Sequence, residues 1–276
     1  MQEKTNVPLV SAIVPAYNEA AHIEMCLTSL KNQTYPRIEI ICVDDGSTDT
    51  TKTIASLYAD FVISLTHQGP AHARNTGANR AKGDILLFID ADTYLDTRYV
   101  TNITKPLLFH HKKAAYPIHE KVANTKNIWS RCFQIDNDLP MTERIRDDER
   151  GKSRKIRAIW KKEFLQTNGY TIGVGYGEDD VLASADAVPV MNALSYHYNP
   201  DTLYDVFLSA RWMGRSKNIK RSLRQFYRYS LVHSLLESTR RILHGASPIF
   251  LVYKIVFDVG FTSGMLIKNQ RHDYAK

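Results

Sequence analysis

The sequence is poor in cysteine, with three residues in 276: Cys26, Cys42 and Cys132. An odd number at wide spacing fits neither a disulfide framework nor a cysteine-ligated metal cluster. Cys26 and Cys42 stand within apolar patterns and are expected to be small buried side chains. Residues 1–8 are polar and lack the apolar core of a signal peptide. We therefore expect a protein of the reducing cytoplasm.

The glycines of a dinucleotide-binding site are absent after the first expected strand. Such a site needs Gly-x-Gly-x-x-Gly directly after the strand, where this chain has Pro15-Ala16-Tyr17-Asn18-Glu19. The composition, 43% hydrophobic and 24% charged, is typical of a globular protein. A chain of 276 residues has room for one large domain, alone or with an appendage.

Acidic residues are scarce at the C-terminal end. Residues 211–276 contain thirteen Lys and Arg against three Asp and Glu, whereas the other 210 residues contain 23 against 26. The net charge of +7 therefore belongs to the C-terminal end. A basic segment on a near-neutral body favours an anionic partner surface. We expect that surface to be a membrane and expect no nucleic acid.

Strand and helix patterns alternate through the first third of the chain. Apolar runs predict strands at residues 9–14, 38–43, 61–65 and 85–89, each followed by a helical pattern. This alternation predicts an α/β fold with a doubly wound, mostly parallel sheet. The carboxyl ends of such strands share one edge of the sheet, and ligands bind there.

Two carboxylates, Asp90 and Asp92, follow the fourth strand with only Ala91 between them. Two neighbouring acids repel each other unless a cation lies between them. Mg²⁺ and Mn²⁺ take oxygen ligands and often bridge to a substrate phosphate. The triplet therefore predicts a metal–diphosphate site, and a solvated turn is the alternative.

Four motifs in order resemble the inverting family 2 glycosyltransferases of the GT-A fold. They are VSAIVPAYNE at residues 10–19, VDDGSTD at residues 43–49, ARNTG at residues 73–77 and DAD at residues 90–92. The resemblance is dense over residues 9–95 and thinner to residue 215. It implies a GT-A domain over residues 1–215, with a nucleotide-binding half (9–95) and an acceptor half (96–215). A basic helical segment, residues 216–276, follows.

The resemblance implies roles in binding the donor nucleotide. Tyr17 would stack on the base, and Asp45 would accept a hydrogen bond from a ring N–H of uracil or guanine. Glu19 would lie near the ribose, and Arg74 would face the diphosphate. The further nucleotide contacts that it implies are Pro15, Ala16, Gly69, Asp90 and Ala91.

It also implies the metal ligands and the catalytic base. Asp92 would bind Mn²⁺ or Mg²⁺, and Asp90 would bind the metal or the ribose. His197 stands where related enzymes often place a third metal ligand, and a structural histidine is the alternative. Asp179 matches the base that removes a proton from the acceptor hydroxyl.

Four further residues are candidates for the acceptor site. Glu178 and Asp180 flank the candidate base, although acids at a helix start also fit the helix dipole. Arg211 and Trp212 are similar to the end of a Gln-x-x-Arg-Trp signature, in which the tryptophan meets the acceptor. The glutamine position holds Leu208, so the signature is incomplete.

Residues 249–267 are long and apolar enough to cross a bilayer. However, Lys254 and Asp258 interrupt the run four residues apart, where they could pair on one helix face, and charge at the bilayer centre is costly. Gly260 and Gly264 would let another helix approach closely. We expect the C-terminal segment to touch an anionic membrane surface without spanning it. The alternative is a helix packed on its own domain or in a homodimer.

These patterns predict a metal-dependent, inverting hexosyltransferase peripheral to the inner face of the membrane. The expected donor is a UDP- or GDP-sugar, and the acceptor is the hydroxyl of a glycan or of a lipid-linked molecule. One alternative is a sugar-phosphate nucleotidyltransferase, which would need a glycine-rich basic loop after the first strand. Another is a nucleotide-sugar-binding subunit without activity, against which Asp90, Asp92 and Asp179 argue.

Overall fold

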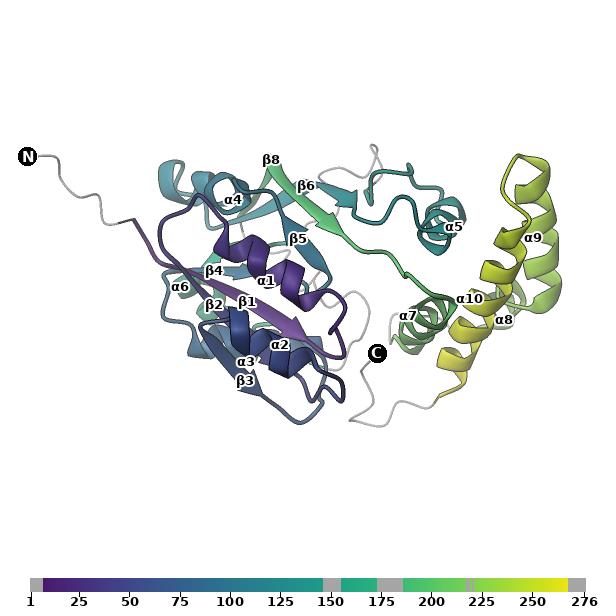
Figure 1. Cartoon of the computed structure of the whole chain (residues 1–276), viewed down its shortest axis with the longest axis horizontal. Coiled ribbons are helices and arrows are strands. Elements are labelled where there is room, and N and C mark those ends of the chain that lie inside the picture. Colours follow the sequence, from purple (N-terminus) through teal and green to yellow (C-terminus); the bar gives the residue numbers. More distant parts are fainter. Residues whose placement is uncertain (1–6, 146–154, 173–185, 217–218, 220, 268–276) are drawn as a thin grey trace, which may run out of the picture. The chain divides into compact units, whose positions relative to one another are not determined.

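The computed structural model describes residues 7–145, 155–172, 186–216, 219 and 221–267 (Figure 1). The chain divides into two compact units that do not follow its order. Unit 1 comprises Met1–Lys121, Asp147–Thr171 and Asp179–His197. Unit 2 comprises Val122–Arg146, Ile172–Glu178 and Tyr198–Lys276. The division of the chain at residue 215 stays a prediction.

Unit 1 is built on an eight-stranded sheet of order β3-β2-β1-β4-β7-β6-β8-β5. The strands are β1 Val10–Ala16, β2 Ile38–Asp44, β3 Phe61–Ser64, β4 Ile85–Phe88, β5 Thr93–Leu95, β6 Ala114–Val122, β7 Ala158–Trp160 and β8 Ala187–His197. The first four strands pair in parallel, as the sequence predicts. β7 is antiparallel to both β4 and β6, and β5 is antiparallel to β8, so the sheet as a whole is mixed.

Helices cover both faces of this sheet. They are α1 Ile23–Lys31, α2 Thr51–Tyr58, α3 Pro70–Arg80, α4 Tyr99–Phe109 and α6 Lys161–Gln166. Alternate residues of β1 point to opposite faces, so Ala12 packs in one core with Leu27 of α1 and Ile103 of α4. Ile13 packs in the other core with Ala73 of α3 and Phe164 of α6. The doubly wound arrangement is thereby confirmed.

Two glycines set the position of α3 on the sheet. Gly69 has φ 94°, a backbone conformation that favours glycine, and Pro70 then begins the helix. Gly77 faces β1, where a Cβ atom would lie 2.4 Å from Cγ2 of Ile13. The absence of a side chain lets α3 lie directly on β1, which brings Arg74 to the carboxyl edge of the sheet.

Unit 2 is helical in its described part. Its helices are α5 Ile128–Asp136, α7 Leu203–Arg215, α8 Leu223–Arg228, α9 Leu231–Leu243 and α10 Ile249–Leu266. Helix α5 lies in a polar, highly charged stretch, residues 119–153, in which the sequence predicts no regular element. The Asn127 side chain starts this helix by accepting hydrogen bonds from the backbone N–H groups of Trp129 and Ser130.

Helix α10 is long and apolar enough to cross a membrane, yet half of its residues are buried in the protein. A Cβ atom on Gly260 would lie 2.6 Å from the carbonyl oxygen of Phe207, and one on Gly264 would lie 2.1 Å from that of Arg211. Both partners belong to α7, so the close helix approach predicted for this glycine face occurs within the chain. The face is therefore not free to receive a second copy.

Candidate functional site

Asp45 organises the loop after β3 at the carboxyl edge of the sheet in unit 1. It follows β2 and is only 2% exposed. Its Oδ1 accepts a hydrogen bond from the backbone N–H of Gln68 at 3.0 Å, and Oδ2 accepts one from that of Gly69 at 2.7 Å. Nδ1 of His67 lies 2.9 Å from Oδ2. Asp45 thus holds residues 67–69, and its contact with a base stays a prediction.

The Tyr17 ring is stacked on the imidazole of His67, with centroids 3.8 Å apart and planes 17° from parallel. Tyr17 follows β1 and is half-buried. The two rings present a flat aromatic surface beside Asp45, and an aromatic face of this kind suits a nucleobase. His67 is a member of the site that the sequence analysis missed. The feature of the sequence that could have revealed His67 is its position in the loop directly after an expected strand.

Asp90 is held between two arginines. Nη2 of Arg74 lies 2.8 Å from Oδ1, and Nη2 of Arg157 lies 2.7 Å from Oδ2. Burial alone would raise the pKa of Asp90, but the charges of Arg157 and Arg74 outweigh it and hold the pKa well below its usual value. Both arginines are largely buried, and Nη2 of Arg157 also lies 3.9 Å from Oε1 of Glu120.

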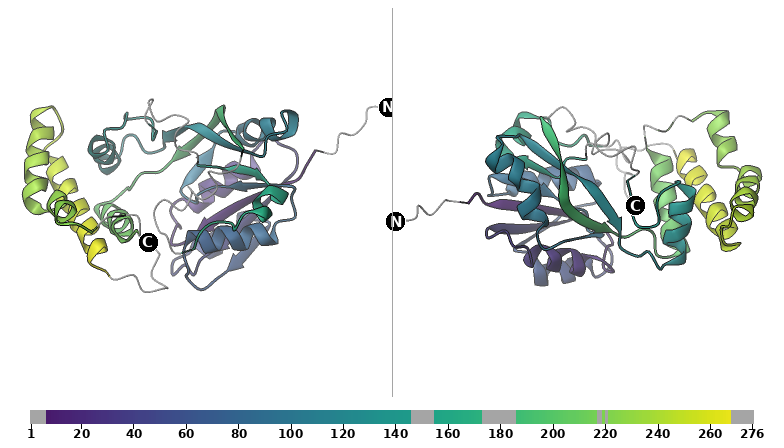
Figure 2. Two further views of the ribbon diagram at one scale, coloured as in Figure 1. Left: turned by 180° about the vertical axis from the view of Figure 1, so that it is seen from behind. Right: turned by 90° about the horizontal axis from the view of Figure 1, so that it is seen from above.

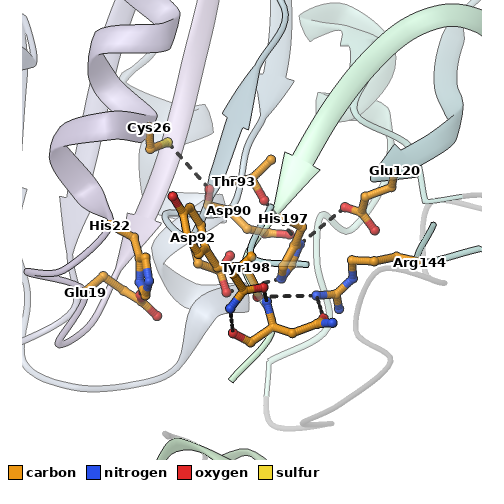
Figure 3. A network of polar contacts seen from close by, with 12 residues as sticks. Glu19, His22, Cys26, Asp90, Asp92, Thr93, Glu120, Arg144, His197 and Tyr198 are labelled. Carbon is orange, nitrogen blue, oxygen red and sulfur yellow. Dashed lines mark hydrogen bonds and ion pairs between the residues drawn. The ribbon is translucent and has the colours of Figure 1, made fainter. Parts of the chain in front are cut away.

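His197 lies between two carboxylates, as Figure 3 shows. Its Nε2 is 3.2 Å from Oδ2 of Asp92, and its Nδ1 is 3.3 Å from Oε1 of Glu120. The hydroxyl of Thr93 lies 3.2 Å from the same Nδ1. The antiparallel pairing of β5 and β8 sets Thr93 opposite His197. The pairing of the two strands thus brings Thr93 and His197 into contact, although they are 104 residues apart in the chain.

The Asp92–His197 pair has the chemistry of a metal site. It offers a carboxylate oxygen and an imidazole nitrogen, which suit Mn²⁺. Glu120 meets the second ring nitrogen, a contact that fixes the orientation of metal-binding histidines. Within the described part of the chain, no group of three His, Cys, Asp or Glu side chains converges to bind a metal. Two protein ligands suit an ion that also binds a substrate diphosphate.

The remaining nucleotide candidates of unit 1 lie around the same edge. Oε2 of Glu19 lies 3.3 Å from Nδ1 of His22. Ala16 at the end of β1 and Ala91 between the two aspartates are 3% and 4% exposed, and Pro15 is buried. Their contacts with a nucleotide stay predictions, as does that of Gly69.

The structure does not test the catalytic and acceptor candidates. Asp179, Glu178 and Asp180 are outside the described residues. Arg211 and Trp212 lie in α7 of unit 2, where the carbonyl oxygen of Arg211 faces Gly264. Their roles stay predictions from the sequence.

Two charged residues of the site, Glu120 and Arg157, were not predicted. Glu120 is 7% exposed on β6, and Arg157 is 6% exposed directly before β7. A charged residue beside an apolar run, as in Ile156-Arg157-Ala158-Ile159, was the available signal. Charges are rarely buried without partners, so such positions mark candidate polar clusters.

The family model "Glycosyl transferase family 2" matches residues 11–168. The chain is 28% identical over 267 residues to the uncharacterized glycosyltransferase YibD of Escherichia coli (strain K12), covering 87% of this chain and 73% of that protein. The chain spans only 28–38% of the length of five other curated relatives that it matches.

Solved structures share the fold at low identity. The mannosyltransferase PcManGT from Pyrobaculum calidifontis, in complex with GDP-Man and Mn²⁺, aligns with a TM-score of 0.55 and 20% identity over 94% of this chain and 74% of that one. S. aureus TarS 1–349 in complex with UDP aligns with a TM-score of 0.54 and 18% identity over 92% and 90%. The predicted GT-A architecture, with a helical C-terminal segment, is confirmed.

Proposed function

The chain belongs to glycosyl transferase family 2, and we propose that it is a metal-dependent, inverting hexosyltransferase. In this proposal it transfers a sugar from a UDP- or GDP-sugar to a hydroxyl group of a glycan or of a lipid-linked acceptor. The observation that carries the proposal is the Asp92–His197 pair, with Nε2 and Oδ2 3.2 Å apart. The similar PcManGT structure, which holds GDP-Man and Mn²⁺, supports the donor class and the metal.

The base of the donor would bind where Tyr17 stacks on His67. A base could lie on the exposed face of this aromatic pair or displace His67 from Tyr17. Asp45 supports either arrangement because it holds the backbone of Gln68 and Gly69 through its two oxygens. Its remaining acceptor capacity would meet a ring N–H of the base.

The diphosphate would bind at the two arginines. Arg74 and Arg157 both contact the carboxylate of Asp90, so two guanidinium groups lie close together at this edge of the sheet. Contacts between guanidinium and phosphate are strong, and two neighbouring guanidinium groups suit the oxygens of a diphosphate. Asp90 would then position both arginines and leave metal binding to Asp92 and His197.

Asp92 and His197 would hold the divalent ion, with Glu120 fixing the orientation of the imidazole. A bound Mn²⁺ or Mg²⁺ offsets the charge that develops on the leaving diphosphate. Asp179 would accept the proton of the acceptor hydroxyl. The acceptor oxygen forms its bond to the anomeric carbon as the bond from that carbon to the diphosphate oxygen breaks. The electron pair leaves with the diphosphate, and one in-line displacement inverts the anomeric centre.

Calorimetry with UDP and GDP, each with and without Mn²⁺, tests the site. We expect one nucleotide to bind in a metal-dependent manner and Asp92→Ala to abolish that dependence. Asp186→Ala is the matched control, because Asp186 of the same unit is an exposed carboxylate paired only loosely with Lys112 at 3.5 Å. Metal-dependent binding that survives in Asp92→Ala would contradict the assignment.

A further inference from the structure

Helix α9 in unit 2 turns its apolar side outward. Five large apolar residues are between 50% and 81% exposed, and we call them the leucine face: Leu231, Val232, Leu235, Leu236 and Leu243. The residues turned inward are small and polar, since Ser234 and Ser238 are at most 1% exposed. A helix on the surface of a water-soluble domain has the opposite arrangement. Contact with water would leave the leucine face unfavourably exposed, so we expect another surface to cover it.

The inward side of α9 is fixed by a charged cluster in the core of unit 2. Nζ of Lys254 lies 2.9 Å from Oδ1 of Asp258 and 3.1 Å from Oδ1 of Asp136. The Ser234 hydroxyl donates to Oδ2 of Asp258 at 2.7 Å. Burial alone would lower the pKa of Lys254, but the two carboxylates raise it, so the lysine stays charged. This cluster anchors α10 in the protein and ties α9 to it, which keeps the leucine face outside.

The apolar exposure continues on the neighbouring helices. On α8, Leu223 is 90% and Tyr227 is 56% exposed. On α10, which runs beside α9 in both views of Figure 2, Val252, Val259 and Leu266 are exposed at seven-residue spacing and thus share one side of the helix. Half of the twenty large apolar side chains that are exposed among the described residues lie in residues 223–266. Such a concentration marks an interaction surface.

Positive charge accompanies the exposed apolar residues of α8 and α9. Arg224 and Arg228 follow Leu223 and Tyr227 by one position, so they form the adjacent stripe of α8, and all four are exposed. Residues 221–246 hold five arginines and a single acid, Glu237, which pairs with Arg240 and Arg241. Apolar side chains beside arginines match the two layers of an anionic bilayer surface, acyl chains and headgroups.

We propose that α8 and α9 dock unit 2 onto an anionic membrane surface, with the leucine face inserted at the boundary of headgroups and acyl chains. A second copy fits less well, because a two-fold interface would bring the same arginine stripe against itself. Helix α10 does not span the bilayer in this arrangement. Its charged pair stays in the protein core, and its glycine face stays on α7.

Sedimentation of the full chain with vesicles tests the proposal. We expect binding to phosphatidylglycerol-containing vesicles and little binding to pure phosphatidylcholine. Leu235→Glu/Leu236→Glu should weaken it at least about tenfold, because each leucine contributes burial of apolar area. Arg224→Gln/Arg228→Gln should weaken vesicle binding about thirtyfold, because each basic residue near an anionic surface contributes about 1 kcal/mol of binding free energy. Raising NaCl from about 0.1 M to about 1 M, which shortens the Debye length to about 3 Å, should also weaken it.

Leu57→Glu/Leu165→Glu is the matched control, since these leucines of unit 1 are 71% and 55% exposed. It should bind like the wild type. Circular dichroism and thermal unfolding of each variant confirm that it is folded. Sedimentation velocity without lipid identifies a second copy. A dimer that Leu235→Glu/Leu236→Glu dissociates, without vesicle binding by the wild type, would overturn the proposal. A folded, monomeric wild type that does not bind anionic vesicles would also overturn the proposal. The leucine face would then be a site for another protein.

Discussion

Nη2 of Arg157 lies 2.7 Å from Oδ2 of Asp90, although 67 residues separate the two in the chain. The contact depends on β7, which enters the sheet antiparallel to β4, and the carbonyl oxygen of Arg157 accepts a hydrogen bond from the N–H of Phe88 at 2.8 Å. The C-terminal strands of unit 1 therefore complete a site that the first four strands begin. Among the residues that the structure describes, Arg74 and Arg157 are the charged partners of the Asp90 carboxylate at this distance.

Asp90→Asn should lower the stability of the protein by about 3 kcal/mol at neutral pH, because it removes a charged partner that two largely buried guanidinium groups share. The folded-state pKa of Asp90 is depressed, so its contribution exists above the unfolded-state pKa near 4 and disappears as the pH falls through the folded value. The difference in the free energy of unfolding between the wild type and Asp90→Asn, measured in urea, should therefore decrease as the pH is lowered. A difference independent of pH would contradict this account of Asp90.

Glu120→Gln should weaken Mn²⁺ binding by about 10- to 100-fold, the usual effect of removing the group that orients a metal-binding histidine. Glutamine keeps the shape of Glu120 but not its charge beside Nδ1 of His197. Titration of Mn²⁺ by electron paramagnetic resonance, in the presence of the bound nucleoside diphosphate, measures this affinity. Glu163→Gln, which alters a pair with Lys113 at 2.9 Å elsewhere in unit 1, is the control. Equal affinity in all three proteins would show that Glu120 has no such role.

The part of the site that follows β1, β2 and β4 could be predicted from the sequence. Each of these strands is a mostly apolar run, interrupted only by Ser11 in β1 and by Glu39 before the end of β2. The polar residues directly after the runs, Asp45 and Asp90 among them, must lie at the carboxyl edge. Local pattern and position along the chain are enough for this inference. The parallel order of the first four strands follows from the same alternation.

The partners Glu120 and Arg157 could not be predicted, because they depend on the pairing of strands distant in sequence. Register between such strands is set by the packing of both faces, and a shift by one residue turns every side chain to the opposite face. The apolar pattern at residues 156–160 fits a strand, but nothing in it shows that this strand lies antiparallel beside β4. Helix α5 was missed for a different reason: two of its three buried residues, Ser130 and Gln134, are polar.

Asp179→Asn should leave donor affinity unchanged and lower turnover by on the order of 10²-fold or more, as expected for the loss of a positioned base. The prediction comes from the sequence, because Asp179 lies outside the described residues. Single-turnover kinetics separate the chemical step from donor binding. Asp186→Asn, at an exposed carboxylate of the same unit, is the control and should retain most activity. Near-normal turnover in Asp179→Asn would shift the assignment to Glu178 or Asp180.

Gly264→Ala should destabilise unit 2 because its new Cβ would lie 2.1 Å from the carbonyl oxygen of Arg211. Helices α7 and α10 would have to separate, and overpacking of this kind typically costs about 1–3 kcal/mol. Val259→Ala on the exposed side of α10 is the control, with little expected effect. Thermal unfolding followed by circular dichroism compares the two. Equal melting temperatures for Gly264→Ala and the wild type would show that α7 and α10 do not pack this closely.

The most direct test of the central claim is the release of nucleoside diphosphate from a panel of UDP- and GDP-sugars. It should be measured with Mn²⁺ and after its removal by EDTA, for the wild type and Asp92→Ala. The account predicts that the wild type turns over at least one donor only when metal is present, and that Asp92→Ala turns over none. Turnover that survives EDTA would contradict the metal site, and tight donor binding without any turnover would identify a non-catalytic sugar-nucleotide-binding protein.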